Sequence, residues 1–345
     1  MQFFSSKMGR MKILGIETSC DETACAIVED GTKVLSNAID SQIDLHAITG
    51  GVVPEVAARE HVLNILPIID QALLDAKVGW DDIDAIALTK GPGLISSLII
   101  GTQTASVISY VKNKPIVPVQ HIVGHIYSNW LDIDDEIKFP VLVLTVSGGH
   151  NDLILVKDHL EFEVLGETLD DAAGEAFDKV SRMLGLGYPG GPAISKIALE
   201  GDDKAFNLPR PYLDNATLDF SFSGLKTAVL DVIKKQQTID DKFKADMAAS
   251  FQEAVCDVLS IKLLRALKKY DVQEVHLAGG VSANTRLREV LTWKLPSDIK
   301  FRYPKSLVYC TDNAAMIASA GYFAFSRNPS QFSVSNIVPS TDFRI

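Results

Sequence analysis

The sequence is poor in cysteine, in positive charge and in uninterrupted apolar runs, and each shortage argues against a class of protein. Its 345 residues include four cysteines and no CxxC pair. This argues against a disulfide framework and favours a reducing compartment, with the cytoplasm as the default. The chain has 44 acidic and 33 basic residues, a formal net charge of −11. Overall charge therefore does not drive nucleic-acid binding, although a local basic groove stays compatible with this composition.

The most apolar stretch, residues 94–111, carries seven Ser, Thr and Gln side chains, so we expect a buried helix there and no membrane span. Residues 1–10 lack the apolar centre of a secretory signal and the Arg-rich length of a transit peptide, and we interpret them as a loose leader. Apolar residues make up 47% of the chain. At this length, that composition predicts a globular protein of about two lobes.

A strand–turn–strand–strand pattern occurs twice. In the first copy the strands are 11–17, 24–30 and 33–39 and the turn is 18–23. In the second copy the strands are 139–146, 152–158 and 160–167 and the turn is 147–151. An offset of 128 aligns the copies, placing Ser19 on Ser147 and Asp30 on Asp158. The repeat predicts two lobes of related topology, each presenting its first hairpin turn to a shared cleft. The alternative, that any two amphipathic hairpins look this similar, is open at this point.

Helices and strands are expected to alternate along the rest of the chain. Helices are predicted at 54–76, 94–111, 121–131, 171–184, 241–269, 283–293 and 312–325, and strands at 83–89, 116–119 and 274–277. This alternation indicates an α/β fold. Pro/Gly-rich turns are expected at 91–93 and 187–192, and an exposed insertion at 207–214. Helix 54–76 either packs in the core, which we favour, or forms part of a partner interface.

His121 and His125 are four residues apart after an apolar strand, so on a helix both project from one face and are able to chelate one metal. The zinc-protease signature needs Glu after the first His, where this chain has Ile122, so a peptidase is disfavoured. A third ligand is required, and Asp312 at a predicted helix start is the best candidate. The alternatives are that Asp312 is an N-cap and that the histidines are ordinary surface or core residues.

Gly-rich turns follow two predicted strands. The turn SGGH (147–150) either brings backbone N–H groups close to an anion or is a hairpin turn that needs positive φ. The turn in LAGGVSAN (277–284) opens a helix, as phosphate-binding turns do, but does not match GxGxxG, so a nicotinamide cofactor is disfavoured. Asn284 either contacts a ribose or base or satisfies backbone groups at the helix start.

Two carboxylates and one glycine complete the set of candidates. Either Asp178 accepts hydrogen bonds from ribose hydroxyls and Gly191 lets a sugar or base pack on the backbone, or Asp178 is a solvated helix residue. Glu17 ends the first strand and either faces the cleft or is only a turn residue. No residue stands out as a general base, and Glu17 is the one weak catalytic candidate.

The motifs together resemble the TsaD family over about residues 11–327. They are GIETSCDET (15–23), GGVVPEVAAREH (50–61), GPGL (91–94), HIVGHIYSN (121–129), SGGH (147–150), LGETLDDAAGEAFDKVSRMLGLGYPGGP (165–192), FSFSGLKTAV (220–229), AGGVSANTRLR (278–288) and YCTDNAAMIA (309–318). So many motifs in one order make the resemblance specific.

The resemblance implies a fold of two lobes of the actin-like ATPase and sugar-kinase superfamily with a ligand cleft between them. We expect an N-terminal lobe of residues 11–139 with the helix at about 312–327, and a C-terminal lobe of 140–311. It also implies transfer of threonylcarbamoyl from threonylcarbamoyl-AMP to the exocyclic amine of adenosine 37 in tRNAs that read ANN codons. The alternatives from other classes are an ATP-hydrolysing switch or chaperone-like member of that superfamily, and a non-catalytic scaffold that presents tRNA.

The resemblance further implies one divalent iron or zinc ion held by His121, His125 and Asp312. The residues implied to bind the adenylate are Thr145, Val146, Ser147, Gly148, Gly149, Asp178, Gly191 and Asn284. Implied partners are tRNA, a paralogous TsaB-type subunit and a TsaE-type ATPase, with no membrane. Helical imidazoles plus a distant carboxylate favour the transferase over phosphate-transfer relatives, which rely on carboxylates and magnesium.

Overall fold

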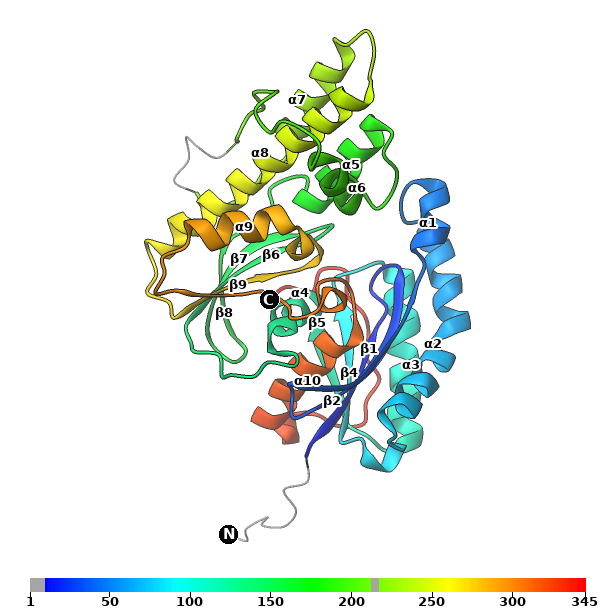
Figure 1. Ribbon diagram of the computed structural model, residues 1–345. Coiled ribbons are helices and arrows are strands. Elements are labelled where there is room, and N and C mark those ends of the chain that lie inside the picture. Colours follow the sequence, from blue (N-terminus) through cyan, green and yellow to red (C-terminus); the bar gives the residue numbers. More distant parts are fainter. Residues whose placement is uncertain (1–9, 212–216) are drawn as a thin grey trace. The chain divides into compact units, whose positions relative to one another are not determined.

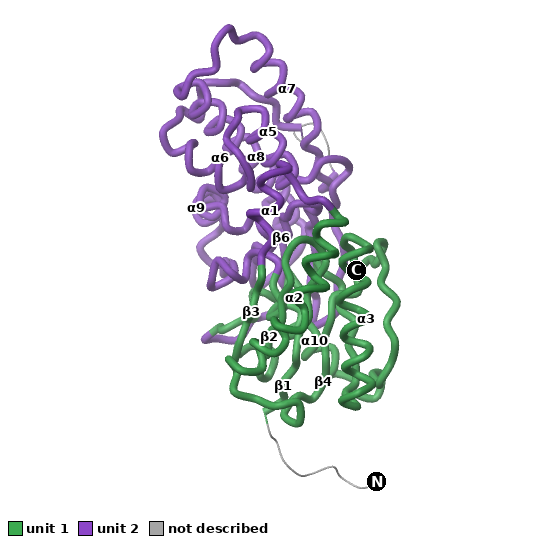
Figure 2. Tube along the Cα trace, turned by 90° about the vertical axis from the view of Figure 1, so that its right-hand side faces the viewer, with its two compact units in different colours: residues 1–40, 54–133, 313–344 green, residues 41–53, 134–312, 345 purple. Residues whose placement is uncertain are grey.

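The computed structural model describes residues 10–211 and 217–345 (Figure 1). The expected leader lies outside the described residues except for Arg10, whose guanidinium pairs with Glu29 at 2.9 Å. Residues 212–214 of the expected insertion also lie outside them. The chain divides into two compact units (Figure 2): residues 1–40, 54–133 and 313–344 form unit 1, and residues 41–53, 134–312 and 345 form unit 2. None of the described helices combines the length and the apolar character needed to cross a membrane.

Unit 1 is built on a five-stranded sheet in the order β3-β2-β1-β4-β5. The strands are β1 (Lys12–Glu17), β2 (Glu22–Glu29), β3 (Lys33–Ser41), β4 (Ala85–Gly91) and β5 (Ile116–Gln120). The β1–β2 pair is antiparallel, whereas β4 is parallel to both β1 and β5. The central strands are buried at nearly every position. Such strands need cover on both faces of the sheet.

Helices provide that cover. Helices α2 (Pro54–Ala76) and α3 (Ile95–Lys112) pack on one face, where Ile65 and Ile69 meet Leu14 of β1, and α10 (Ala314–Arg327) crosses the other face (Figure 1). Gly15 allows α10 to lie directly on β1, because a Cβ at this position would be 2.2 Å from the Ala314 carbonyl oxygen. Two further helices of the unit are α4 (His121–Tyr127), which directly follows β5, and the short η2 (Ser128–Trp130).

Unit 2 has a second five-stranded sheet in the order β10-β9-β6-β7-β8. Its strands are β6 (Val141–Val146), β7 (Asn151–Asp158), β8 (Glu161–Gly166), β9 (Glu274–Ala278) and β10 (Lys300–Arg302). Its longer helices are α5 (Ala173–Leu184), α6 (Gly190–Ala198), α7 (Ser223–Lys234), α8 (Asp241–Leu267) and α9 (Thr285–Lys294), with α1 (Ile43–Thr49) joining from the earlier segment. The core packs Leu142, Leu144 and Leu153 of the sheet against Phe177 of α5 and Phe251 of α8.

The two units repeat one topology, as the sequence predicted. In both sheets an antiparallel three-strand meander is followed by two parallel strands on the opposite side of its first strand. The hairpin registers carry the same offset of 128, since Ile13 pairs with Val28 and Val141 pairs with Val156. The repeat is therefore a true duplication of topology and not a chance likeness of two hairpins.

Some local predictions were wrong. Helices α1, α6 and α7 were not predicted, and the double glycine expected in a turn at 187–192 instead begins α6. A first helical turn tolerates glycine when another group holds its backbone, and the Gly190 N–H is bound by Asp178. The segment at 207–211 is not simply exposed, since Leu208 is buried in the core and Arg210 pairs with Asp257.

Candidate functional site

Helix α4 brings two histidines together at its start. The Gln120 side chain caps the helix by accepting a hydrogen bond from the Val123 N–H at 2.9 Å. Helical spacing then places His121 and His125 on one face, with ring centroids 4.7 Å apart and ring planes at 78°. Both side chains are buried. The prediction that the two imidazoles share a face is confirmed.

Asp312 lies where the chain returns to unit 1 and enters α10. The N-cap of that helix is Asn313, whose side chain accepts from the Met316 N–H at 3.1 Å, so the interpretation of Asp312 as an N-cap is wrong. Gly124 permits α4 to approach α10, since a Cβ there would be 2.6 Å from Ile317 Cδ1.

Near the contact of α4 with α10, three side chains of metal-ligating types lie close together. One ligand atom from each of His121, His125 and Asp312 lies within 4.8 Å of the other two. Among the described residues, these three form the group of His, Cys, Asp or Glu side chains close enough together to hold one metal ion. Two imidazoles and one carboxylate suit iron or zinc, whereas magnesium and calcium prefer oxygen ligands alone. Three protein ligands leave coordination positions for water or substrate.

Glu17 lies directly behind His121. Its side chain is fully buried, and one carboxylate oxygen accepts the Ser19 N–H at 2.5 Å. The other oxygen accepts a hydrogen bond from the Thr89 hydroxyl and lies 3.3 Å from His121 Nδ1, which is also 3.2 Å from Ser19 Oγ. A carboxylate on one imidazole nitrogen orients the ring and assigns metal binding to the other nitrogen. Glu17 is thus a neighbour of the group and not a turn residue.

The turn after β1 is held from the opposite side by His61 of α2. His61 Nε2 lies 3.0 Å from the Cys20 carbonyl oxygen, and its Nδ1 lies 2.8 Å from Thr23 Oγ1. Burial lowers the pKa of His61, which keeps the ring neutral near pH 7. A neutral ring has one donor and one acceptor, which suits a carbonyl and a hydroxyl. The motif at 50–61 therefore fixes the turn that carries Ser19.

The corresponding turn of unit 2 lies between β6 and β7. Thr145 and Val146 end β6, and the Ser147 N–H donates to the His150 carbonyl at 2.8 Å. A Cβ at Gly148 or Gly149 would meet nothing within 4 Å, so open space adjoins this backbone. Neither glycine has positive φ, and the idea that the turn requires glycine for that reason is wrong.

Helix α5 starts against this turn. The Gly174 N–H donates to the Ser147 carbonyl at 3.2 Å, and the Glu175 N–H donates to the Gly148 carbonyl at 3.1 Å. Gly174 is required there, because a Cβ would lie 2.5 Å from the Ser147 oxygen. The first N–H groups of α5 are thus satisfied by the turn itself.

Asp178 and Gly191 meet at the start of α6. Asp178 Oδ1 accepts the Gly190 N–H at 2.7 Å, so Asp178 is not simply a solvated helix residue. A Cβ at Gly191 would meet nothing within 4 Å, which leaves that backbone open to a ligand.

The second glycine turn lies at the end of β9. Gly279 has φ +84°, and a Cβ there would be 2.5 Å from the Val146 carbonyl oxygen, so the turn packs closely on the end of β6. Asn284 is the N-cap of α9 and accepts from the Leu287 N–H at 3.0 Å. The interpretation in which Asn284 satisfies the helix start is confirmed.

Asp152 of β7, next to the turn between β6 and β7, has a raised pKa. Burial raises its pKa to about 6, although a hydrogen bond from the Thr145 hydroxyl at 3.2 Å opposes the shift. Asp152 was not predicted as a site residue, because an aspartate after a turn is usually solvated.

The acidic pair Asp170 and Asp171 is bonded to side chains at and near the start of α7. Asp170 accepts hydrogen bonds from the Ser221 and Ser223 hydroxyls at 2.5 and 2.7 Å, and Asp171 pairs with Lys226 at 2.5 Å. Burial raises the pKa of Asp171, but the lysine contacts outweigh it and leave that pKa below its ordinary value. The pair therefore anchors the start of α7.

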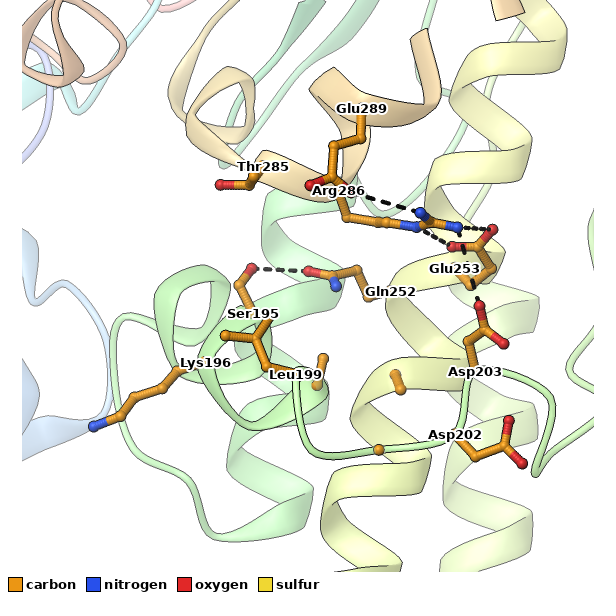
Figure 3. Close-up of a pocket in the computed structure, with 13 residues that line it drawn as sticks. Ser195, Lys196, Leu199, Asp202, Asp203, Gln252, Glu253, Thr285, Arg286 and Glu289 are labelled. Atoms are coloured by element: carbon orange, nitrogen blue, oxygen red, sulfur yellow. Dashed lines mark hydrogen bonds and ion pairs between the residues drawn. The ribbon is translucent and has the colours of Figure 1, made fainter. Parts of the chain in front are cut away.

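A pocket of about 720 Å³ opens among α6, α8 and α9 of unit 2 (Figure 3). Ser195 and Gln252 line it, and Arg286 lies along one wall, paired with Glu253 at 2.7 and 3.0 Å. Neither Ser195 nor Gln252 was among the residues predicted from the sequence. One available signal was that Gln252 is polar within a largely apolar helix.

Comparisons with known proteins identify the family of this chain. The family described as TsaD: tRNA N6-adenosine threonylcarbamoyltransferase matches residues 33–319. A relative of that name from Dehalococcoides mccartyi is 53% identical over 317 residues, covering 91% of this chain and 94% of its own. Another from Clostridium kluyveri is 50% identical over 335 residues, covering 96% and 97%.

Solved structures confirm the fold class. The crystal structure of HypF from T. kodakarensis matches with a TM-score of 0.63 at 14% identity, covering 92% of this chain and 48% of that one. At that identity the likeness speaks for the fold alone, and the fold is the actin-like ATPase type expected from the sequence. From the family match and the identity of its relatives, the chain belongs to the TsaD family, the tRNA N6-adenosine threonylcarbamoyltransferases.

Proposed function

We propose that the protein transfers the threonylcarbamoyl group from threonylcarbamoyl-AMP to N6 of adenosine 37 in tRNAs that read ANN codons. In this reaction a C–N bond forms at the carbamoyl carbon and the C–O bond to the phosphate breaks. AMP leaves with the electron pair, and the amine proton passes to solvent. The observation that carries the proposal is the group of His121, His125 and Asp312 within 4.8 Å, in a chain of this family.

The donor set supports a divalent iron or zinc ion held by these three residues. Such an ion supplies a Lewis acid or an anchor for the threonyl part of the donor. The chain's own residues prepare the ligands: Glu17 and Ser19 contact His121 Nδ1 and thereby assign Nε2 to the ion. We therefore propose that Glu17 is a positioning residue and not an acid or base.

The remaining sequence candidates are proposed to hold the adenylate. Open space at Gly148, Gly149 and Gly191 supports close approach of a phosphate or sugar to the backbone. Thr145, Val146, Ser147, Asp178 and Asn284 complete the proposed set. Purine amines are weak nucleophiles, so holding the donor and the amine in register is a large part of the catalysis.

A TsaB-type subunit is proposed to dock on the outer face of α2 and α3, and a TsaE-type ATPase to assist turnover in the cytoplasm. One face of α2 is core, as we favoured, but the other exposes apolar side chains. Those on the two helices are Val56, Val62, Leu63, Leu66, Leu74, Ile95, Ile99, Val107, Tyr110 and Val111. Exposed apolar faces of this kind mark interaction sites.

The test is reconstitution of the protein with its partners, tRNA, threonine, bicarbonate and ATP, read by nucleoside analysis. We expect His121→Ala to lose the bound metal and the modified nucleoside while its melting temperature stays near that of the parent. His159→Ala, in the turn between β7 and β8, is the matched control and should retain both. Full modification by metal-free His121→Ala protein would contradict the proposal.

A further inference from the structure

Three polar side chains of unit 2 form a closed hydrogen-bonded triangle that joins α6, α8 and α9. Gln252 Oε1 accepts from Ser195 Oγ at 2.9 Å and from Asn284 Nδ2 at 2.9 Å. Asn284 Nδ2 also donates to Ser195 Oγ at 3.1 Å. Figure 3 shows Ser195 and Gln252 pointing toward one another from α6 and α8.

The triangle fixes the orientation of the Asn284 amide. Its Oδ1 accepts from the Leu287 N–H, which only an oxygen is able to do, so the assignment of oxygen and nitrogen follows from chemistry. The Nδ2 group lies within hydrogen-bond distance of both Gln252 Oε1 and Ser195 Oγ, so the amide nitrogen faces the triangle. Oδ1 accepts one bond, from the Leu287 N–H, and keeps a second lone pair. Asn284 is therefore set to accept a hydrogen bond from a ligand hydroxyl or amino group.

The same triangle reaches the start of α6. Ser195 lies one helical turn after Gly191, on the same face of the helix, and the preceding Gly190 N–H is held by Asp178. Gln252 thus holds at once the amide of Asn284 and the helix that begins with Gly191. Gln252 and Asn284 are both buried, and a buried Gln that lost these bonds would leave polar groups of its neighbours unsatisfied.

We propose that Gln252 is a positioning residue for the adenylate: through the triangle it presents the oxygen of Asn284 to a donor group of the nucleotide and sets α6 beside it. The proposal rests on the proposed function, in which Asn284 and Gly191 bind the adenylate. Ser195 is the second positioning residue of the triangle. Ser195 and Gln252 also line the pocket of about 720 Å³.

The test compares AMP binding by full-length variants in titration calorimetry. Gln252→Met keeps the side-chain length but removes the acceptor, and we expect binding about tenfold weaker, since a net hydrogen bond contributes about 1 kcal/mol and an unsatisfied donor adds to the loss. Gln252→Glu keeps the acceptor and should bind AMP within about threefold of the parent. Gln236→Met, at an exposed position, is the matched control and should bind like the parent.

A double mutant separates positioning from general structural damage. Because Gln252 acts in part through Asn284, the Asn284→Ala/Gln252→Met double variant should lose clearly less AMP affinity than the sum of the two single losses. Additive losses would overturn the proposal. Parent-like binding by Gln252→Met alongside weak binding by Asn284→Ala would overturn it too, while leaving the adenylate site intact. Parent-like binding by Asn284→Ala would remove both the site assignment and this proposal.

A folding control keeps the test decisive. Thermal unfolding of each variant is measured first, and if Gln252→Met does not fold, Ser195→Ala replaces it. Ser195→Ala removes one donor to Gln252 and one acceptor for Asn284, and should weaken AMP binding about threefold to tenfold. Unchanged AMP binding by folded Ser195→Ala protein would likewise overturn the proposal.

Discussion

Replacing Glu17 by Gln tests whether a buried carboxylate sets the tautomer of a metal-binding histidine. In the parent, one oxygen of Glu17 is committed to the Ser19 N–H, and the other faces Thr89 and His121 Nδ1. In Glu17→Gln the amide oxygen must stay on the Ser19 N–H. The NH₂ group then faces His121 and donates to Nδ1, which moves the ring proton to Nε2.

That tautomer is wrong for metal binding through Nε2, because a metal ligand nitrogen must be unprotonated. Loss of partners of this kind typically lowers metal affinity 10–100-fold, or about 1.4–2.7 kcal/mol. We take the upper part of that range, since Glu17 is fully buried and its negative charge beside the ring is therefore screened little by solvent. The expected loss is therefore about 30–100-fold.

The assay is competition of the full-length protein with a chelator for Zn²⁺, together with nitrogen NMR of the histidine rings. The chain has seven histidines, few enough to assign His121 by comparison with His121→Ala. We expect the proton on Nδ1 in the parent and on Nε2 in Glu17→Gln. Glu29→Gln is the control, because Glu29 is a glutamate of β2 with little exposed surface whose carboxylate pairs with Arg10, Lys12 and Lys33.

The result that refutes the reasoning is parent-like zinc affinity in folded Glu17→Gln protein while His121→Ala has lost it. An unchanged tautomer in the variant would refute it independently, because the argument requires the amide to donate where the carboxylate accepted. A loss in Glu29→Gln equal to that in Glu17→Gln would show a general effect of buried charge instead.

Three further predictions concern separate parts of the chain. Asp178→Ala should weaken adenylate binding about tenfold and tRNA binding much less, measured by calorimetry with each ligand; equal losses would contradict its placement. Asp152→Asn should stabilise the protein at pH 8 by at most about 3 kcal/mol in urea unfolding and by almost nothing at pH 4. The sign follows because the folded-state pKa is raised from 3.8 to about 6, so the parent loses stability as pH rises through that interval; a gain that persisted at pH 4 would refute the cause. Leu63→Glu, on the exposed face of α2, should leave stability within about 0.5 kcal/mol and weaken binding of the TsaB-type subunit more than tenfold in a pull-down titration; undiminished binding would exclude that face.

The duplicated topology was readable from the sequence because strand pairing depends on short-range order. A hairpin register is set by residues within about twenty positions of each other. Alternating burial along each strand leaves a pattern in the sequence, and the two copies of this pattern align at an offset of 128. Helices of strong periodicity were equally predictable. Helices α6 and α7 were not, because they begin in glycine-rich or serine-rich segments whose local preference is for turns.

The shared helical face of His121 and His125 follows from their spacing alone, since 3.6 residues per turn place positions four apart side by side. The family resemblance, carried by the order of the motifs, added Asp312 as the expected third ligand. Why Asp312 reaches the histidines is a tertiary matter: Gly15 and Gly124 let α10 lie against β1 and α4, and no local pattern encodes that approach.

By itself the sequence determined the elements whose signals are local and the family to which the chain belongs, and it supplied the candidate residues for its chemistry. Only the tertiary structure decided which atoms of those residues are hydrogen-bonded to other parts of the protein. Glu17 on the ring of His121, and Gln252 on the amide of Asn284, are hydrogen bonds across 104 and 32 positions of the chain. A polar side chain has the same local preference whether it faces water or a partner, so burial by distant elements is what assigns it a role.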